Sequence, residues 1–524
     1  PFDKKAAFAY FFNANNDDNA MQRNVPGFNP IYIAGYLQDK FTFKDMIFNV
    51  GLRLDRYDAN QMVPRDLYSL YPIKTAAEAR AEGIAIPSSV GDDYKVYIDD
   101  MDATNKTAVG FRDENNKWYN SVGTAVSDPA IIASSTKSGS ITPYLVNPKE
   151  NVKSSNFNVD GSFKKYEAQY VLMPRISFSF PISAEAIFFA HYDILAQRPD
   201  AFSSRNNPMN YLFMENSVGA VLNNPNLKPQ KTTDYELGFA QSISSLSAIT
   251  ISAFYREIKD MVQLMPIQYA YPVNYLTFGN IDFGTVKGIS FIFEQRRINN
   301  LKLNANYTLQ FAEGTGSNSV SSINLLNSGS PNLRTIVPLD FDRRHNINLE
   351  VDYRYGRGKN YLGPSWGRKI LAALGANFMF RAGSGAPYSR QSNITQDAAL
   401  TKSQSHTLSG QPNGSRLPWN FRVDTRIDKN FIFKFGDKDE KQKITVLNAY
   451  FTVNNLFNTR NILHVYRYTG NANDDGFLTA SVSQQEINSK VNAQSFIDLY
   501  SILINSPNNY SMPRTLRVGV IYNF

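Results

Sequence analysis

Apolar and polar residues alternate strictly along many segments of this chain. In the segment 346–355, for example, Ile347 and Leu349 alternate with Asn348 and Glu350. Side chains of a β-strand point to opposite faces with a period of two, so this pattern predicts strands that lie between two different environments. It predicts about thirteen strands, most of them near the ~9–11 residues that cross a bilayer at a tilt. Besides 346–355, the predicted strands are 36–43, 48–55, 176–182, 187–195, 235–243, 249–256, 289–296, 301–311, 371–381, 421–428, 447–454 and 516–524.

The connections between these strands alternate in length. Tight polar turns, such as 183–185, 244–247 and 299–300, follow every second strand. The remaining connections are long and polar; they are 58–170, 197–231, 260–285, 312–343, 382–418 and 458–511. A soluble sandwich or propeller has no reason to sort loop length by strand parity, whereas outer-membrane barrels have short periplasmic turns and long extracellular loops. We therefore expect an all-β fold, a transmembrane antiparallel β-barrel, as a single domain over 1–524.

A barrel wall in a membrane explains the mixture of charged and apolar residues within one strand. Lipid cannot hydrogen-bond a backbone, so a spanning sheet must close, with an apolar outer face and a lumen that meets water or a plug. An Arg at the midplane of the lipid face would cost roughly 2–4 kcal/mol. The charged residues of the strands are therefore predicted to face the lumen; they are Arg53, Asp55, Glu236, Arg256, Glu294, Arg296, Glu350, Asp352, Arg354, Arg422, Asp424 and Arg426.

Composition excludes several other classes. The chain has no cysteine, so neither a disulfide scaffold nor a cysteine-ligated metal site is expected. Its net charge of +8 is spread over the whole length rather than clustered, which argues against nucleic acid as a partner. The four histidines are scattered, and no HExxH, GxSxG or P-loop motif is present, so no catalytic residue is predicted and the protein is not expected to be an enzyme.

The last strand, 516–524, ends the chain on an aromatic residue. Tyr522 and Phe524 follow apolar residues at alternate positions. This arrangement resembles the C-terminal signal by which the barrel-assembly machinery identifies outer-membrane proteins.

Several motifs resemble the TonB-dependent transporters of the bacterial outer membrane. The segment 452–460 (TVNNLFNTR) is similar to the family's NLF element near the end of the barrel. Segment 226–238 (NLKPQKTTDYELG) resembles a strand entry of the family, and 383–388 (GSGAPY) resembles one of its loop entries. Tyr36 to Lys40 (YLQDK), followed by 51–55 (GLRLD), is similar to a hairpin near the middle of such barrels. The resemblance is to Bacteroidota-type receptors, closer to the Oar-like group than to the SusC-like group.

The resemblance implies a 22-strand barrel behind an N-terminal plug, of which this chain is the C-terminal part. The plug and the first strands are then expected to lie before residue 1, and no signal peptide is visible at the start. Such receptors import a scarce substrate, here a peptide, glycan or metal chelate, with energy from TonB–ExbB–ExbD acting through the N-terminal region. Lipid of the outer membrane, and a surface lipoprotein or larger complex, would be the other partners.

The longest loop, 58–170, holds two further features. The stretch from Thr75 to Glu82 is rich in Ala and Glu and predicts a short helix. Asp99, Asp100 and Asp102 form a small acidic cluster whose oxygens would suit a structural calcium ion, although the spacing is not that of an EF-hand and a solvated loop is the default reading. No other cofactor is expected.

Two alternatives to an importer stay open at this point. A barrel of the same family could serve as a scaffold or subunit of a surface, secretion or barrel-assembly complex, or the chain could be a soluble all-β enzyme or binding module. A plug and TonB box upstream would favour import, protein partners on the loops would favour a scaffold, and solubility without detergent would favour a soluble module.

Overall fold

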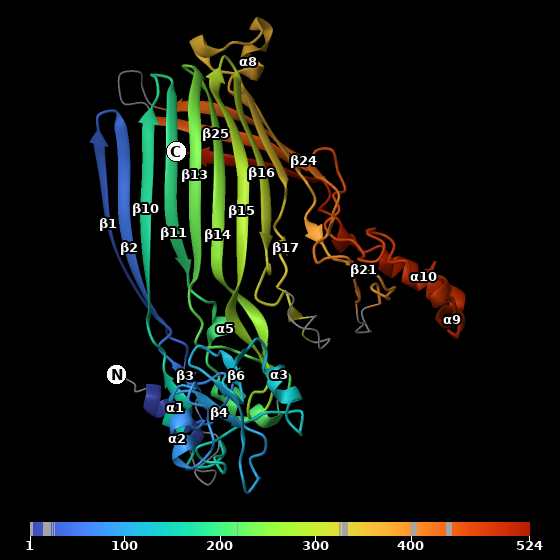
Figure 1. Cartoon of the computed structure of the whole chain (residues 1–524). Helices are drawn as coiled ribbons and strands as arrows, with labels where there is room; N and C mark the ends of the chain where they lie inside the picture. Colours follow the sequence, from blue (N-terminus) through green and yellow to red (C-terminus); the bar gives the residue numbers. More distant parts are fainter. Residues whose placement is uncertain are drawn as a thin grey trace.

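The computed structural model describes residues 4–13, 23, 25, 27–216, 218–323, 326, 334–399, 406–435 and 443–523. It is dominated by one 15-stranded sheet, in which long antiparallel strands stand side by side (Figure 1). The long strands of this sheet, in the order in which they pair, are β1 (Ile31–Phe43), β2 (Met46–Asp58), β10 (Gln169–Pro181), β11 (Ala186–Gln197), β13 (Gln230–Ser244), β14 (Ser247–Ile267), β15 (Tyr275–Ile298), β16 (Leu301–Gly314), β18 (His345–Arg354), β19 (Leu374–Gly383), β24 (Asn420–Phe435), β25 (Lys443–Asn454) and β26 (Thr515–Asn523).

Every strand predicted from the alternation is present, and each pairs with the next long strand along the chain. The two short strands β12 (Val221–Leu222) and β17 (Val337–Pro338) join the same sheet at β15 and β16. Within the described residues, β1 and β26 each pair with a single strand, so the sheet has two open edges. No helix in the described part of the chain is both long enough and apolar enough to cross a membrane.

The two ends of the sheet differ sharply (Figure 1). Tight turns join β1 to β2, β13 to β14 and β15 to β16 at one end, where Lys44 and Asn299 adopt positive φ. At that same end, β18 and β19 are joined by η3 (Gly358–Asn360), η4 (Ser365–Gly367) and α8 (Arg368–Leu371). The opposite end carries the long connections, as the loop lengths predicted.

The connection between β2 and β10 is a folded unit rather than an extended loop. Together with α1 (Lys4–Asn13), the segment 59–168 forms a compact body that we call the cap (Figure 1). A 5-stranded sheet, β7-β6-β5-β4-β8, lies within it. The elements of the segment are β3 (Met62–Pro64), α2 (Ala76–Ala81), β4 (Lys95–Ile98), β5 (Ala108–Arg112), β6 (Trp118–Asn120), β7 (Ala125–Val126), α3 (Pro129–Ser134), β8 (Thr142–Pro143), α4 (Val159–Ser162) and β9 (Phe163–Lys165).

The helix predicted at Thr75 to Glu82 is α2. Its first turn is a capping box, because the Thr75 amide donates to the Glu78 carboxylate at 2.7 Å and the Glu78 amide donates to Oγ1 of Thr75 at 3.3 Å. These two bonds satisfy amides that a helix start leaves unpaired.

An aromatic core ties α1 to the rest of the cap. Phe8, Phe11 and Phe12 lie at helical spacings of three and four residues, so they share one face of α1, and all three are buried. The rings of Phe8 and Phe12 contact that of Phe163, with centroids 4.9 and 5.6 Å apart. Burial of such rings contributes about 2–3 kcal/mol each. This burial holds the short helix α1 against Phe163, although the two are far apart in sequence.

The predicted loop 260–285 is wrong in its bounds. β14 continues to Ile267 and β15 begins at Tyr275, so only 268–274 separate them. The register shifts between Ile258 and Met261, and beyond that bulge the hairpin passes beside the cap. There Leu264 and Phe278 are fully buried. Both faces of this part of the hairpin are covered, so apolar and polar residues no longer alternate and the strands could not be predicted beyond the bulge.

The other long connections contain only short elements. They are α5 (Ala201–Ser204), α6 (Pro208–Leu212), η2 (Met214–Asn216), β20 (Pro387–Tyr388), β21 (Arg390–Gln391), β22 (Leu408–Ser409), β23 (Ser415–Arg416), α9 (Ser481–Asn488), α10 (Ala493–Ile504) and η5 (Pro507–Asn509).

Candidate functional site

One face of the large sheet is polar along its whole width. Residues opposite one another on paired strands, and residues two apart along a strand, share a face. Following the register in this way, Asp352 lies opposite Asn377, and Asn377 lies opposite Arg426. Of the predicted lumen residues, the register places on this one face Arg53, Asp55, Glu236, Arg256, Glu294, Glu350, Asp352, Arg354, Arg422, Asp424 and Arg426.

The opposite face is apolar and open. Tyr353, Ile427 and Phe451 lie in one row across β18, β24 and β25, with Ala376 of β19 between the first two, and each of the three is about two-fifths exposed. A soluble protein rarely leaves a surface of this extent uncovered, so this face requires an apolar environment. The two faces therefore have the two environments that the alternation predicted.

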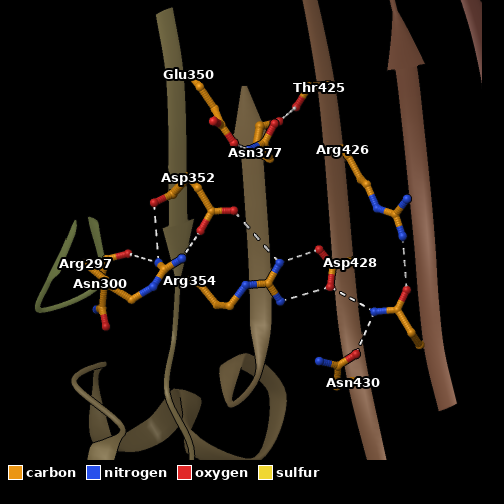
Figure 2. A network of polar contacts seen from close by, with 11 residues as sticks. Arg297, Asn300, Glu350, Asp352, Arg354, Asn377, Thr425, Arg426, Asp428 and Asn430 are labelled. Atoms are coloured by element: carbon orange, nitrogen blue, oxygen red, sulfur yellow. Dashed lines mark hydrogen bonds and ion pairs between the residues drawn. The ribbon is translucent and has the colours of Figure 1, made fainter. Parts of the chain in front are cut away.

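The polar face holds a connected network near the tight-turn end of the sheet (Figure 2). Arg354 is bidentate on Asp428, with Nη1–Oδ2 and Nη2–Oδ1 distances of 3.0 and 2.6 Å, and its Nη2 lies 4.0 Å from Asp352. Asp352 also receives a hydrogen bond from Arg297, and Asp428 receives one of 2.9 Å from Nδ2 of Asn448. Planar guanidinium forks match carboxylates in this bidentate way, and the network as a whole joins the four strands β15, β18, β24 and β25.

Glu350 continues the network toward the middle of the sheet. Its carboxylate accepts hydrogen bonds from the side-chain amides of Asn304 at 3.0 Å and Asn377 at 2.9 Å, on the strands to either side. Both partners are uncharged, so the negative charge of Glu350 is solvated by amide dipoles rather than neutralised.

A second group of charged residues lies across the first half of the sheet. Arg53 pairs with Asp55 at 2.7 Å and Arg256 with Asp234 at 2.9 Å. Between these pairs, the imidazole of His191 lies 3.6 Å from the carboxylate of Glu236.

A third group lies in the second half of the sheet, toward the long-loop end. There Asp424 pairs with Arg422 at 2.7 Å and with Arg381 at 3.5 Å. The polar face is thus lined by paired charges of both signs.

Arg296 is the one predicted lumen residue that the register does not assign to this face. A bulge between Gln295 and Ile298 interrupts the pairing of β15 with β16. Within it, Arg297 makes the ion pair with Asp352, while the amide of Arg296 donates to the carbonyl of Leu246 at 2.8 Å. Alternation alone cannot place side chains through a bulge, since one extra residue reverses the parity.

Several members of the network escaped the prediction. Asp428 and Asn448 continue the alternation of their strands but lie at or near the ends of the predicted segments. Asp234 shares the face of Glu236 but lies one residue before the predicted strand 235–243, whereas His191 and Arg381 lie within or at the end of predicted strands and were not included among the lumen residues. Asn377 is uncharged and carried no signal of its own.

The cap holds a buried charge of its own. Arg112 is almost fully buried; its Nε donates to the Tyr97 hydroxyl at 3.0 Å, and its guanidinium also pairs with Asp66 and stacks on the ring of Tyr68 at 4.7 Å. Burial raises the pKa of the Tyr97 hydroxyl above its ordinary value, so Tyr97 stays neutral and acts as an acceptor for Arg112. A buried pair of this kind fixes the relative position of segments that are far apart in sequence.

The acidic cluster of the cap uses its oxygens locally. Oδ1 of Asp99 accepts from the Asp100 amide at 2.9 Å, and Oδ1 of Asp100 accepts from the Asp102 amide at 2.9 Å. In the described ranges, no group of three or more His, Asp or Glu residues is placed to hold a metal ion. The structural calcium ion therefore stays a prediction without support from this geometry.

At the C-terminus, Tyr522 lies on β26 opposite Leu447 and is half-exposed. Phe524 lies outside the described residues. The role of this strand as an assembly signal stays a prediction.

The family model described as "TonB dependent receptor-like, beta-barrel" matches residues 4–456. The chain belongs to this family. Its members are β-barrels of the outer membrane and act as receptors and transporters rather than enzymes, so the chain is an outer-membrane barrel protein and the soluble alternative falls away. Membership also confirms the predicted fold class.

Among solved structures, the chain is similar to the FrpB iron transporter from Neisseria meningitidis (F3-3 variant) at 11% identity and a TM-score of 0.39, covering 82% of this chain and 42% of that chain. The ferric-catecholate import receptor Fiu from K12 E. coli matches at 12% identity and a TM-score of 0.39, covering 83% and 41%. The Serratia marcescens hemophore receptor HasR, in complex with its hemophore HasA and heme, matches at 11% identity and a TM-score of 0.41, covering 83% and 50%. The chain thus spans half or less of the length of these relatives. The comparison with curated proteins finds no match.

Proposed function

We propose that this chain forms part of the wall of an outer-membrane importer. In this proposal the polar face lines the lumen, the apolar face contacts lipid, and the cap and the other long connections lie outside the cell, where they capture the substrate. The observation that carries the proposal is the band of charged side chains, many of them in ion pairs, on a single face of a sheet whose other face is apolar and exposed. Paired side chains of both signs form a wetted surface against which a plug could be held and released.

The open edges fit the same proposal. Unpaired backbone groups at β1 and β26 would each cost several kcal/mol in lipid, so strands outside this chain are proposed to pair with them and complete a larger barrel. The energy for import would come from TonB–ExbB–ExbD, acting on a region that the described sheet does not include. The substrate is proposed to be a peptide, glycan or metal chelate, and the Bacteroidota-type, Oar-like subgroup is part of the proposal.

The test is energy-dependent uptake by cells that carry or lack the complete gene. Candidate peptides, glycans and metal chelates are supplied as labelled pools, and uptake is measured with and without a protonophore. We expect a class of compound whose uptake requires both the gene and the proton gradient. Growth and uptake that are identical in the deletion strain for every pool would contradict an import role.

One observation favours the scaffold alternative. In the long connection after β25, α10 presents Leu499, Ile502 and Leu503 to solvent, each at least half exposed. An apolar helix face at the long-loop end would suit a protein partner, such as a surface lipoprotein. Purification from membranes in mild detergent discriminates between the two functions, because a scaffold would be recovered with stoichiometric partners on its loops.

A further inference from the structure

The segment 355–373 differs from the other described connections at the tight-turn end. It joins β18 to β19 and includes η3, η4 and α8, whereas its neighbours are turns of a few residues. It carries four cations and no Asp or Glu; the cations are Arg357, Lys359, Arg368 and Lys369. The segment therefore has a net positive charge, which favours anionic partners.

The segment begins against the apolar face of the sheet. Tyr353 lies on that face, opposite Leu301 and Ala376, and its ring meets that of Tyr355 edge-on, with centroids 5.3 Å apart. Tyr355 in turn contacts the ring of Tyr361 at 5.7 Å. The aromatic series therefore leads from the apolar face of the wall into the segment.

Polar contacts hold the rest of the segment on the same side. Nδ2 of Asn300 donates to the Tyr353 hydroxyl and to the Leu362 carbonyl, both at 3.1 Å. Lys429, which lies opposite Leu374 and Ala449 on the apolar face, donates to the carbonyls of Lys369 and Ile370. The segment is thus fixed at the edge of the apolar face, beyond the end of the strands (Figure 1).

The outer surface of the segment combines apolar and cationic side chains. Trp366 is 78% exposed, Ile370 64% and Leu362 55%. The four cations are exposed as well, and none of them forms an ion pair within the part of the chain that the structure describes. Of the four, Arg368 stacks on Tyr361, with its Cζ 5.8 Å from the ring centroid.

We propose that segment 355–373 is a membrane-surface anchor that binds the anionic phospholipid headgroups of the leaflet at the tight-turn end. Trp366, Ile370 and Leu362 enter the boundary between headgroups and acyl chains, and the four cations contact the lipid phosphates. Tryptophan is favoured at this depth, and basic side chains beside it draw in anionic lipid. The occupant is lipid rather than a protein because the anchor continues the lipid-facing side of the wall and offers no carboxylate to a partner. The proposal rests on the apolar face contacting lipid, but not on import.

The first test uses quenching of tryptophan fluorescence. The complete protein is reconstituted into vesicles that contain phosphatidylglycerol and a phosphatidylcholine brominated at shallow acyl positions. Trp366→Phe should remove a large share of the quenchable emission, whereas Trp118→Phe, which alters a residue buried in the cap, should not. A quenchable share that is the same in wild type and Trp366→Phe would overturn the proposal, and would mean that water or protein covers the segment.

The second test measures lipid retention. Detergent-purified protein is mixed with phosphatidylglycerol and phosphatidylethanolamine, and bound lipid is counted by native mass spectrometry. Each cation replaced by Gln should lower the preference for phosphatidylglycerol about fivefold. The matched control replaces four exposed lysines of the cap, namely Lys117, Lys137, Lys149 and Lys165, with Gln.

Both lipid readouts are independent of transport, so a failed uptake experiment would leave them unaffected. Heat-modified migration on gels confirms that each variant folds as a barrel, and the pair Arg357→Gln and Lys359→Gln serves as a milder variant. Equal phosphatidylglycerol preference in the anchor and cap variants would contradict the proposal. Loss in the anchor variants alone supports it.

Discussion

Replacement of Arg354 by Met tests the direction in which the polar face points. The change removes a guanidinium that is bidentate on Asp428 and near Asp352, and it keeps most of the side chain's volume. If the face lines a lumen, the variant loses charge-assisted hydrogen bonds and is destabilised. If the face contacted lipid, removal of an Arg at this end of its strand would instead relieve a cost of about 0–1 kcal/mol. The two orientations thus predict opposite signs.

The size of the loss follows from burial. The Asp428 side chain is 8% exposed and that of Arg354 is 31% exposed. Hydrogen bonds to charged groups contribute about 1.5–3 kcal/mol when buried, and an unpaired buried carboxylate costs more. Because Arg354 is partly solvated and Asn448 still donates to Asp428 in the variant, we expect a loss of about 2 kcal/mol.

The assay is guanidinium unfolding of the protein in phospholipid vesicles, followed by fluorescence and by heat-modified migration on gels. The control is Arg381→Met, because Arg381 is half-exposed and lies 3.5 Å from Asp424; a loss below about 0.5 kcal/mol is expected there. An Arg354→Met protein that is as stable as wild type, or more stable, would refute the lumen assignment of this face.

Three further predictions concern the lipid face and the cap. Leu349→Arg, on the apolar face of β18, should cost roughly 2–4 kcal/mol in the same unfolding assay, and unchanged stability would argue against lipid contact. Phe12→Ala should lower the stability of the cap by about 3–5 kcal/mol, measured as faster proteolysis of the cap while the sheet stays protected. Cleavage rates equal to those of wild type would contradict the assignment of α1 to the cap core. Hydrogen bonds from Lys74 and Tyr144 hold the pKa of Glu82 below its usual 4.5. The ionised Glu82 therefore stabilises the cap fully above pH 4.5, and this stabilisation is lost as the pH falls through the lowered pKa. In Glu82→Gln, the hydrogen-exchange protection of the cap should therefore fall less steeply with pH on the acid side than in wild type. The same acid dependence in variant and wild type would contradict the role of Glu82.

The long strands were predictable because each of them separates two environments. A residue such as Leu349 must be apolar and its neighbour Glu350 polar, so a strand between lipid and lumen shows an alternating pattern in the sequence. The prediction failed where this condition fails. Leu264 and Phe278 are buried on a hairpin that touches the cap, and the alternation disappears there. At the bulge, Arg297 rather than Arg296 reaches Asp352.

The polar network was predictable as a face but not as a set of contacts. The alternation in the sequence assigns Arg354 and Arg426 to the same face. The ion pair between Arg354 and Asp428 instead depends on the register of β18 and β24, which lie on either side of β19. The packing of α1 against Phe163 joins segments about 150 residues apart, and no local pattern carries such information.

The most direct test of the account is a spin-label scan along β16, made in the reconstituted protein with single cysteines introduced at 303–308. Oxygen, which concentrates in lipid, and a nickel chelate, which stays in water, report the environment of each label. The account predicts that oxygen accessibility is high at Leu303, Ala305 and Tyr307 and low at Asn304, Asn306 and Thr308, since these two sets lie on the apolar and the polar face. Accessibilities that do not alternate, or that alternate with the opposite parity, would contradict it.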